Sequence, residues 1–276
     1  MSNQKQASIV KIVVLITYLA MVAVNALANA LPINGIPTGE VSDSLPNLFA
    51  PTGLTFSIWG LIYLLLAAYT LYQLGLFRGE KEADRSVLFT KIGIIFSVSS
   101  LANAIWIFAW HYYSIGLSLI LMLVILVSLI RINLILDQEE FDKREKFFIR
   151  LPFAVYFGWI TVATVANVTS LLVFSGWDGF GIAEPLWTVI IITVGFLIGA
   201  AATLRFKSLA YGLVIIWAYI GIWIKHTSEA GFAGNFPAVI TTVIVSIILL
   251  AVVLIYLLFK SRTAARHGDG SLDASG

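Results

Sequence analysis

The chain has 276 residues, of which 59% are hydrophobic and only 12% charged, and its mean hydropathy is +0.95. This composition excludes an ordinary soluble domain, in which about 45–50% of residues are apolar and about 25% charged. The absence of cysteine excludes disulfides, thiolate metal sites, iron–sulfur clusters and cysteine nucleophiles. A net charge of +2 is too small to indicate a nucleic-acid partner.

Long apolar runs predict helices that cross a membrane. A bilayer core about 30 Å thick needs about 20 mostly apolar helical residues, because hydrocarbon offers no hydrogen-bond partner to an exposed backbone group. We therefore predict an all-α, polytopic transmembrane bundle of eight spans. The expected spans are about Ile9–Ala30, Leu54–Leu76, Val87–Trp110, Ile115–Leu136, Phe148–Phe174, Pro185–Leu204, Leu209–Ile224 and Phe236–Phe259.

The positions of the basic residues test the number of spans, because Lys and Arg collect in cytoplasmic loops. The eight spans leave sixteen basic residues on one side and only Lys225 on the other. Adding or removing a central span would scramble this division, so we expect both termini in the cytoplasm. We expect the membrane to be the plasma membrane of a bacterium or archaeon. The sixteen are Lys5, Lys11, Arg78, Lys81, Arg85, Lys91, Arg131, Lys143, Arg144, Lys146, Arg150, Arg205, Lys207, Lys260, Arg262 and Arg266.

The first span has an alternative interpretation as a cleaved signal peptide. Lys5 and Lys11 precede an apolar run that ends in Ala28-Asn29-Ala30, which has the A-x-A form of a signal-peptidase site. The run is longer than a usual signal-peptide core, which favours a retained helix. Cleavage would leave every later helix in the same orientation.

The segments between the spans are short and predict no soluble domain. The longest outer segment, Leu31–Gly53, carries four prolines and three glycines and should form a stiff, irregular cover over the helix ends; we refer to it as the long loop. Asp137–Lys146 mixes both charge signs, which predicts a solvated face. The polar tail, residues 261–276, is expected to be disordered.

Residue types that carry common catalytic chemistry are missing. The sequence contains no Walker A, H-E-x-x-H or G-x-S-x-G motif. Its three histidines lie far apart, so we expect neither a metal centre nor a cofactor. Every acidic or basic residue falls in a loop or within about a turn of an expected span end, which argues against an ion-coupled pump. A passive carrier would not need such residues.

Aromatic and amide side chains share helix faces instead. In the second span Phe56, Trp59 and Tyr63 are spaced i, i+3 and i+7, which places them on one face. The same spacing recurs in the third and fifth spans, and the first span carries a similar face. These three faces hold Asn103, Trp106 and Trp110; Tyr156, Trp159, Ala163 and Asn167; and Tyr18, Asn25 and Asn29.

A face that holds both Asn and Trp should point into the bundle, because an amide in hydrocarbon needs a partner. If the faces converge, they form a pocket walled by aromatic rings, which suits a flat apolar ligand. The alternative is ordinary packing: Asn side chains also tie helices together, and Trp110, Trp177, Trp187 and Trp223 stand where an interfacial aromatic belt is expected.

Three motifs lie on or beside these faces: Phe49-Ala50-Pro51 with Phe56, Trp59, Leu61 and Tyr63; Leu101-Ala102-Asn103-Ala104-Ile105-Trp106 with Gly116 and Leu117; and Pro152, Trp159, Ala163 and Asn167. They resemble motifs of the tryptophan-rich sensory proteins of the TspO/MBR, or peripheral benzodiazepine receptor-like, family. The resemblance covers about residues 9–175, the first five spans. Two departures occur in the loop, where the family often has two adjacent prolines and a preceding Trp.

The resemblance implies a five-helix domain over residues 1–175, whose first loop covers a pocket for porphyrins, cholesterol-like lipids or synthetic aromatic compounds. Family members are discussed as sensors, tetrapyrrole regulators and transporters, and some are thought to promote light-dependent porphyrin breakdown. Residues 176–260 would be three additional helices. The candidate ligand-binding residues are Pro51, Phe56, Trp59, Tyr63, Asn103, Trp106, Trp110, Tyr156, Trp159, Ala163 and Asn167.

We therefore expect a ligand-binding sensor or regulator in contact with membrane lipid, and not an enzyme. Haem iron needs an axial ligand such as His, and only His111 lies near the expected pocket, so a metal-free tetrapyrrole or a lipid is favoured. A passive transporter of a small hydrophobic solute is the alternative. A homodimer is one assembly that the sequence allows.

Overall fold

The computed structural model describes residues 3–31, 33–78 and 85–269, and this part of the chain is helical, with no strand. Eight of its helices are long and apolar enough to cross a membrane, which confirms the predicted all-α bundle. The second of these segments, Gly53–Gln73, includes a 3-10 turn at Gly53–Ser57 before α3, and the fifth, Lys143–Phe174, includes residues 143–150 before α7. The long helices are α1 (Asn3–Ala30), α3 (Ile58–Gln73), α4 (Ser86–His111), α5 (Ile115–Leu136), α7 (Leu151–Phe174), α8 (Glu184–Phe206), α9 (Leu209–Thr227) and α10 (Pro237–Asp269).

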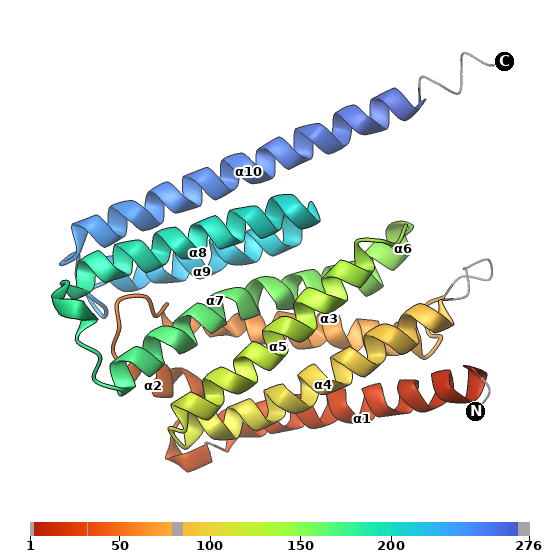
Figure 1. Cartoon of the computed structure of the whole chain (residues 1–276), viewed down its shortest axis with the longest axis horizontal. Helices are drawn as coiled ribbons and strands as arrows, with labels where there is room; N and C mark the ends of the chain where they lie inside the picture. The colour runs from red at the N-terminus through yellow and green to blue at the C-terminus, as the bar shows by residue number, and fades with distance from the viewer. Residues whose placement is uncertain (1–2, 32, 79–84, 270–276) are drawn as a thin grey trace.

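The long helices form two groups (Figure 1). In the first, α1 packs on α4, α4 on α5 and α5 on α7, while α3 packs on α1 and α7; we call this the five-helix group. In the second, α8, α9 and α10 pack on one another and meet the five-helix group mainly through α9 and α7. The start of α1 and the end of α10 lie at the same end of the molecule (Figure 1), as an even number of spans requires.

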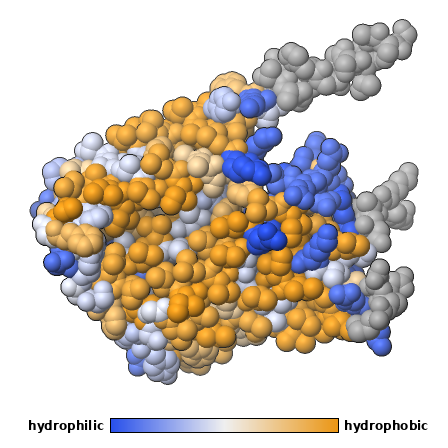
Figure 2. Space-filling view, viewed as in Figure 1, coloured by the Kyte–Doolittle hydropathy of each residue, from blue (hydrophilic) through white to orange (hydrophobic). Residues whose placement is uncertain are grey.

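The outer surface of the helices is apolar. Leu64 is 72% exposed and Leu61 50% exposed in the middle of α3, a position that suits hydrocarbon and not water. Figure 2 shows apolar residues over most of the visible surface, with hydrophilic residues gathered mainly at the end where α5 meets α6 (Lys143–Glu145). The protein is therefore an integral membrane protein.

The predicted solvated face at Asp137–Lys146 is mostly exposed, but Phe141 and Glu145 are buried. Glu145 is buried and accepts a hydrogen bond of 2.8 Å from Arg85 Nε, while Asp142 and Glu145 form a capping box at the start of α6. The Arg85 guanidinium also pairs with Glu139 at 2.9 Å. The hydrogen bond to Glu145 raises the pKa of Arg85 above its ordinary value. Charges that look solvated in the sequence thus tie the start of α4 to the turn after α5.

Two helix boundaries differ from expectation. The fifth span is preceded by α6 and a π-helical turn at Lys146–Arg150. This turn ends just before Pro152, whose ring cannot follow a regular α-helical turn without a clash. At the other end of the chain α10 continues to Asp269, so the first part of the expected disordered tail is helical. Residues 270–276 of that tail lie outside the described residues.

Buried amides join the helices of the five-helix group. Asn25 Nδ2 of α1 donates to Asn103 Oδ1 of α4 at 2.8 Å, and Asn103 Nδ2 donates to the hydroxyl of Tyr156 in α7 at 3.1 Å. Tyr18 also donates from α1 to the backbone oxygen of Tyr63 at 2.9 Å. With these contacts α1 is an integral part of the bundle.

Replacing Asn25 should destabilise the bundle. Asn25→Ala removes the amide that bonds to Asn103, and we expect the free energy of unfolding in mixed micelles to fall by about 1 kcal/mol. The matched control is Asn29→Ala, because Asn29 is exposed and bonds only within its own helix, to Asn25 O at 3.0 Å. Equal losses in the two variants would contradict a structural role for this amide chain.

Candidate functional site

The aromatic faces of α3, α4 and α7 converge around Trp59. Its ring is stacked on Tyr63 at a centroid distance of 5.6 Å and lies 6.4 Å from Trp106 and 6.2 Å from Trp159. Phe56 meets Trp159 edge to face at 5.7 Å. Helical spacing thus brings side chains from three helices into one cluster beneath the long loop.

Two cavities adjoin this cluster, and both are lined by Phe56 and Trp59. The first is small, about 30 Å³, and is walled mainly by α4 and α7 with Pro51 of the long loop. The second is about 260 Å³ and lies toward α1, between Asn25, Asn29 and the segment at Thr38. The rings of Phe56 and Trp59 therefore lie between the two spaces.

Several buried polar atoms around these cavities have no hydrogen-bond partner. Trp106 Nε1, Trp159 Nε1 and Asn167 Oδ1 are unpaired, and all three residues line the first cavity. The hydroxyl of Tyr63, which lines the second cavity, is also unpaired. Buried polar groups normally have partners, so these four atoms are open to a further hydrogen bond. Five other buried polar atoms without a partner belong to residues that line neither cavity: Tyr69, Gln73, Ser100 and His226.

The structure separates the predicted site residues by position. The first cavity is lined by Pro51, Phe56, Trp59, Trp106, Trp110, Trp159, Ala163 and Asn167, and the second by Phe56, Trp59 and Tyr63. Asn103 and Tyr156 line neither of the two. Their polar atoms bond to each other, and Asn103 is 0% exposed, so the pair joins α4 to α7. The ring of Tyr156 also packs edge to face against Trp59 at 5.9 Å.

Other lining residues were not among the predicted site residues. Ala166 and Ser170 of α7 continue the face that begins at Ala163, and extending the helical spacing by one turn finds them. Met122 of α5 and Ser42 also line the first cavity, but neither belongs to an aromatic stripe. Ser42 lies in the short helix α2 (Thr38–Asp43), which reaches the cavity only through the fold of the long loop.

His111 anchors the first part of the long loop to the end of α4. It is completely buried, and its two ring nitrogens lie 2.9 Å from Ile33 O and 3.0 Å from Thr38 Oγ1. Trp110 Nε1 donates to the backbone oxygen of Thr38 at 3.2 Å. Both ring nitrogens of His111 are thus engaged by the loop. The described residues contain no group of three or more His, Cys, Asp or Glu side chains placed to hold a metal ion.

Helix α9 holds the second part of the long loop and the turn that follows it. Trp217 Nε1 donates to Thr55 O at 3.0 Å, and the Thr52 N–H donates to Gly221 O at 3.2 Å. A Cβ on Gly221 would collide with the side chain of Thr55, so glycine is required for this close approach. The loop residues next to Pro51 are therefore fixed by a helix of the second group.

Two further contacts lie toward the end of α9. His226 Nε2 lies 2.8 Å from Leu48 O, and Lys225 Nζ pairs with the carboxylate of Asp43 at 2.6 Å. Lys225 is the one basic residue that the span assignment leaves on this side. It thus serves to hold the long loop against α9.

Comparison with known proteins agrees with this architecture. A family model described as TSPO-like protein matches residues 11–256. The chain belongs to the family of TSPO-like proteins. No curated protein and no solved structure matches the chain.

The match to the TSPO-like family begins in α1 and ends in α10. It therefore continues past residue 175, where the resemblance seen in the sequence ended, and includes α8–α10. These three helices are part of the TSPO-like region, which fits the contacts that α9 makes with the long loop.

Loss of the Trp217 hydrogen bond should loosen the turn after Pro51. In Trp217→Phe we expect backbone amides within residues 52–57 to exchange hydrogen about two- to tenfold faster, because one hydrogen bond of about 0.5–1.5 kcal/mol is lost. Hydrogen–deuterium exchange measured by mass spectrometry checks this. Trp223→Phe is the matched control, since Trp223 lies on the same helix and is 39% exposed against 36% for Trp217. Equal exchange rates in Trp217→Phe and Trp223→Phe would contradict the role of Trp217 in holding this turn.

Proposed function

We propose that this TSPO-like protein is a membrane sensor or regulator that binds a planar hydrophobic ligand, a metal-free tetrapyrrole or a lipid, in the aromatic cluster beneath the long loop. The observation that carries this proposal is the set of unpaired buried polar atoms on Trp106, Trp159 and Asn167, which all line one apolar cavity. The sixteen-to-one division of basic residues supports an orientation with the long loop outside and both termini in the cytoplasm.

Ligand binding requires a movement of the rings between the two cavities. Pockets for small organic ligands measure about 300–1,000 Å³, whereas the first cavity holds about 30 Å³ and the second about 260 Å³. A rotation of Trp59, with a shift of Phe56, would join the two into one space of suitable size. Aromatic rings from α3, α4 and α7 would then stack against a flat ligand.

The unpaired atoms indicate what polar groups the ligand carries. The indole N–H groups of Trp106 and Trp159 are donors, so they call for a carbonyl, carboxylate or hydroxyl oxygen on the ligand. Asn167 Nδ2 already donates to Ser118 Oγ at 2.8 Å, so its free Oδ1 calls for a donor such as a pyrrole N–H or a hydroxyl. Tetrapyrroles and sterol-like lipids offer groups of these kinds.

Binding without turnover is favoured over transport. The residues that line the two cavities come from α1, α3, α4, α5, α7 and the long loop with its following turn, and none comes from α8–α10. This lining supports binding over a transport path completed by the three C-terminal helices. The polar groups lining the cavities are amides, hydroxyls and indoles, which do not titrate near neutral pH and are poor general acids or bases.

Protoporphyrin IX provides the test of binding. We expect saturable quenching of tryptophan emission when it is titrated into the purified protein, with a dissociation constant about two- to tenfold higher in Trp59→Ala, because a stacked aromatic pair contributes about 0.5–1.5 kcal/mol. The control is Trp223→Ala, which removes an exposed tryptophan that lines neither cavity. Affinity, and not the amplitude of quenching, is compared, because each variant loses one fluorophore.

The absence of saturable quenching, or the same affinity in Trp59→Ala and Trp223→Ala, would rule out a tetrapyrrole in this cluster. Flux of protoporphyrin into proteoliposomes separates binding from transport. A sensor gives no protein-dependent flux, whereas flux that is lost in Trp59→Ala would identify the protein as a carrier.

A further inference from the structure

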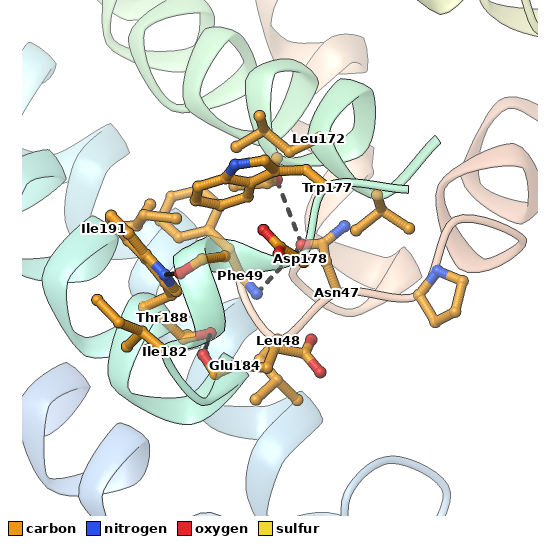
Figure 3. A pocket seen from close by; sticks show the side chains of 15 residues that line it. Asn47, Leu48, Phe49, Leu172, Trp177, Asp178, Ile182, Glu184, Thr188 and Ile191 are labelled. Carbon is orange, nitrogen blue, oxygen red and sulfur yellow. Dashed lines mark hydrogen bonds between the residues drawn. The ribbon is translucent and has the colours of Figure 1, made fainter. Parts of the chain in front are cut away.

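A third cavity, of about 360 Å³, lies between the two helix groups on the side of the long loop that faces α8. Its lining comes from the segment Pro46–Phe49, the end of α7, the turn after α7 and the start of α8 (Figure 3). None of its lining residues lines the two cavities around Trp59. It is thus separate from the site described above and already large enough for a small organic molecule.

Aromatic rings form part of the wall of this cavity. Trp177 and Trp187 lie with their ring centroids 5.0 Å apart, and Phe49 of the long loop lines the cavity with them. Trp187 is held by a hydrogen bond of 2.6 Å from its Nε1 to Gly179 O. Gly179 has a φ of +67°, and a Cβ there would lie 2.9 Å from the Trp187 ring. The turn after α7 is therefore shaped around an indole whose position is fixed.

The charged groups at this cavity are all negative. Asp178 and Glu184 line it, and no Lys, Arg or His does. Within the described residues neither carboxylate forms an ion pair. The sole basic side chain assigned to this end of the bundle, Lys225, is engaged by Asp43. Excess negative charge around an aromatic-walled space attracts cations and repels anions.

The interior of the cavity is shaped before any ligand arrives. Asn47 Oδ1 accepts hydrogen bonds from the N–H groups of Phe49, at 3.1 Å, and Ala50, at 2.9 Å, which sets the turn that presents Phe49. One carboxylate oxygen of Asp178 accepts from the Phe180 N–H at 3.0 Å. Figure 3 shows how Asn47, Phe49, Trp177 and Asp178 lie around the space. Binding of a ligand therefore costs little conformational entropy in these groups.

From this geometry we propose that the third cavity binds an organic ammonium cation with an apolar body. The positive group would lie against the faces of Trp177 or Trp187 and near the carboxylates of Asp178 and Glu184, while the apolar body contacts Phe49 and the neighbouring aliphatic residues. Cation–π attraction and an unpaired carboxylate together select a positive charge, and the aromatic wall selects an alkylated ammonium over a small hydrated ion. Two kinds of ligand carry such an alkylated ammonium group: a free organic amine and the head group of a choline lipid.

Calorimetric titration with benzyltrimethylammonium tests this proposal on the full chain in a neutral detergent. We expect saturable binding to the wild type and a dissociation constant about three- to fivefold higher in each of Asp178→Asn and Glu184→Gln, the loss typical of one exposed charge pair. Asp178→Asn keeps an oxygen that can accept from the Phe180 N–H, so the turn is retained. Trp177→Ala should weaken binding by a similar factor.

The matched control is Glu229→Gln, which removes one negative charge from the same end of the bundle but does not line the cavity. Its affinity should stay within about twofold of the wild type. An equal loss in Glu229→Gln and Glu184→Gln, tight binding of benzoate, or no binding of the cation to the wild type would overturn the proposal. The result is independent of protoporphyrin binding, which uses other residues.

Added short-chain phosphatidylcholine distinguishes the two sources of the ammonium group. If it raises the apparent dissociation constant of benzyltrimethylammonium in the wild type but not in Trp177→Ala, the cavity takes a lipid head group. If the constant is unchanged, the cavity takes a free cation. Either result supports an ammonium site, provided that the carboxylate variants bind more weakly than the control.

Discussion

The inability of hydrocarbon to form hydrogen bonds is the constraint on which this structure depends. A polar side chain within a membrane span must find a partner inside the protein. The chain Asn25–Asn103–Tyr156 meets this requirement and joins α1, α4 and α7. Trp106, Trp159 and Asn167 do not meet it completely, although they lie in the same bundle. Tyr69, Gln73 and Ser100 also carry unpaired buried atoms, but only Trp106, Trp159 and Asn167 combine such an atom with a place in the wall of the first cavity.

The same constraint explains the structural role of α9, which supplies hydrogen-bond partners to the long loop. The long loop and the turn after it cannot satisfy their backbone groups in a regular ladder, and α9 supplies partners through Trp217, Gly221 and His226. Together with His111 on α4, these contacts hold the loop at both of its ends over the aromatic cluster. The match to the TSPO-like family model extends through α8 and α9 into α10, so the helix that makes these contacts lies within the matched region.

The lengths of the apolar runs in the sequence predicted the eight spans. Helical spacing predicted which helix faces carry Trp59, Trp106 and Trp159, because periodicity determines which side chains share a face, but it left open whether these faces converge. It did not distinguish Asn103 from Asn167, since one paired and one partly unpaired amide look alike in a sequence. The buried Arg85–Glu145 pair was also not predicted, because it joins segments 60 positions apart. Likewise the contacts of α9 with the long loop arise from tertiary packing, and no local sequence pattern predicts them.

The most direct test of the account is an experimental structure of the protein with protoporphyrin IX bound. It should show Trp59 rotated away from Tyr63, the two neighbouring cavities joined around the ligand, and an oxygen of the ligand about 3 Å from Trp106 Nε1 or Trp159 Nε1. A structure with Trp59 still stacked on Tyr63 and the porphyrin bound elsewhere on the protein would contradict the central claim that the unpaired polar atoms mark the binding site.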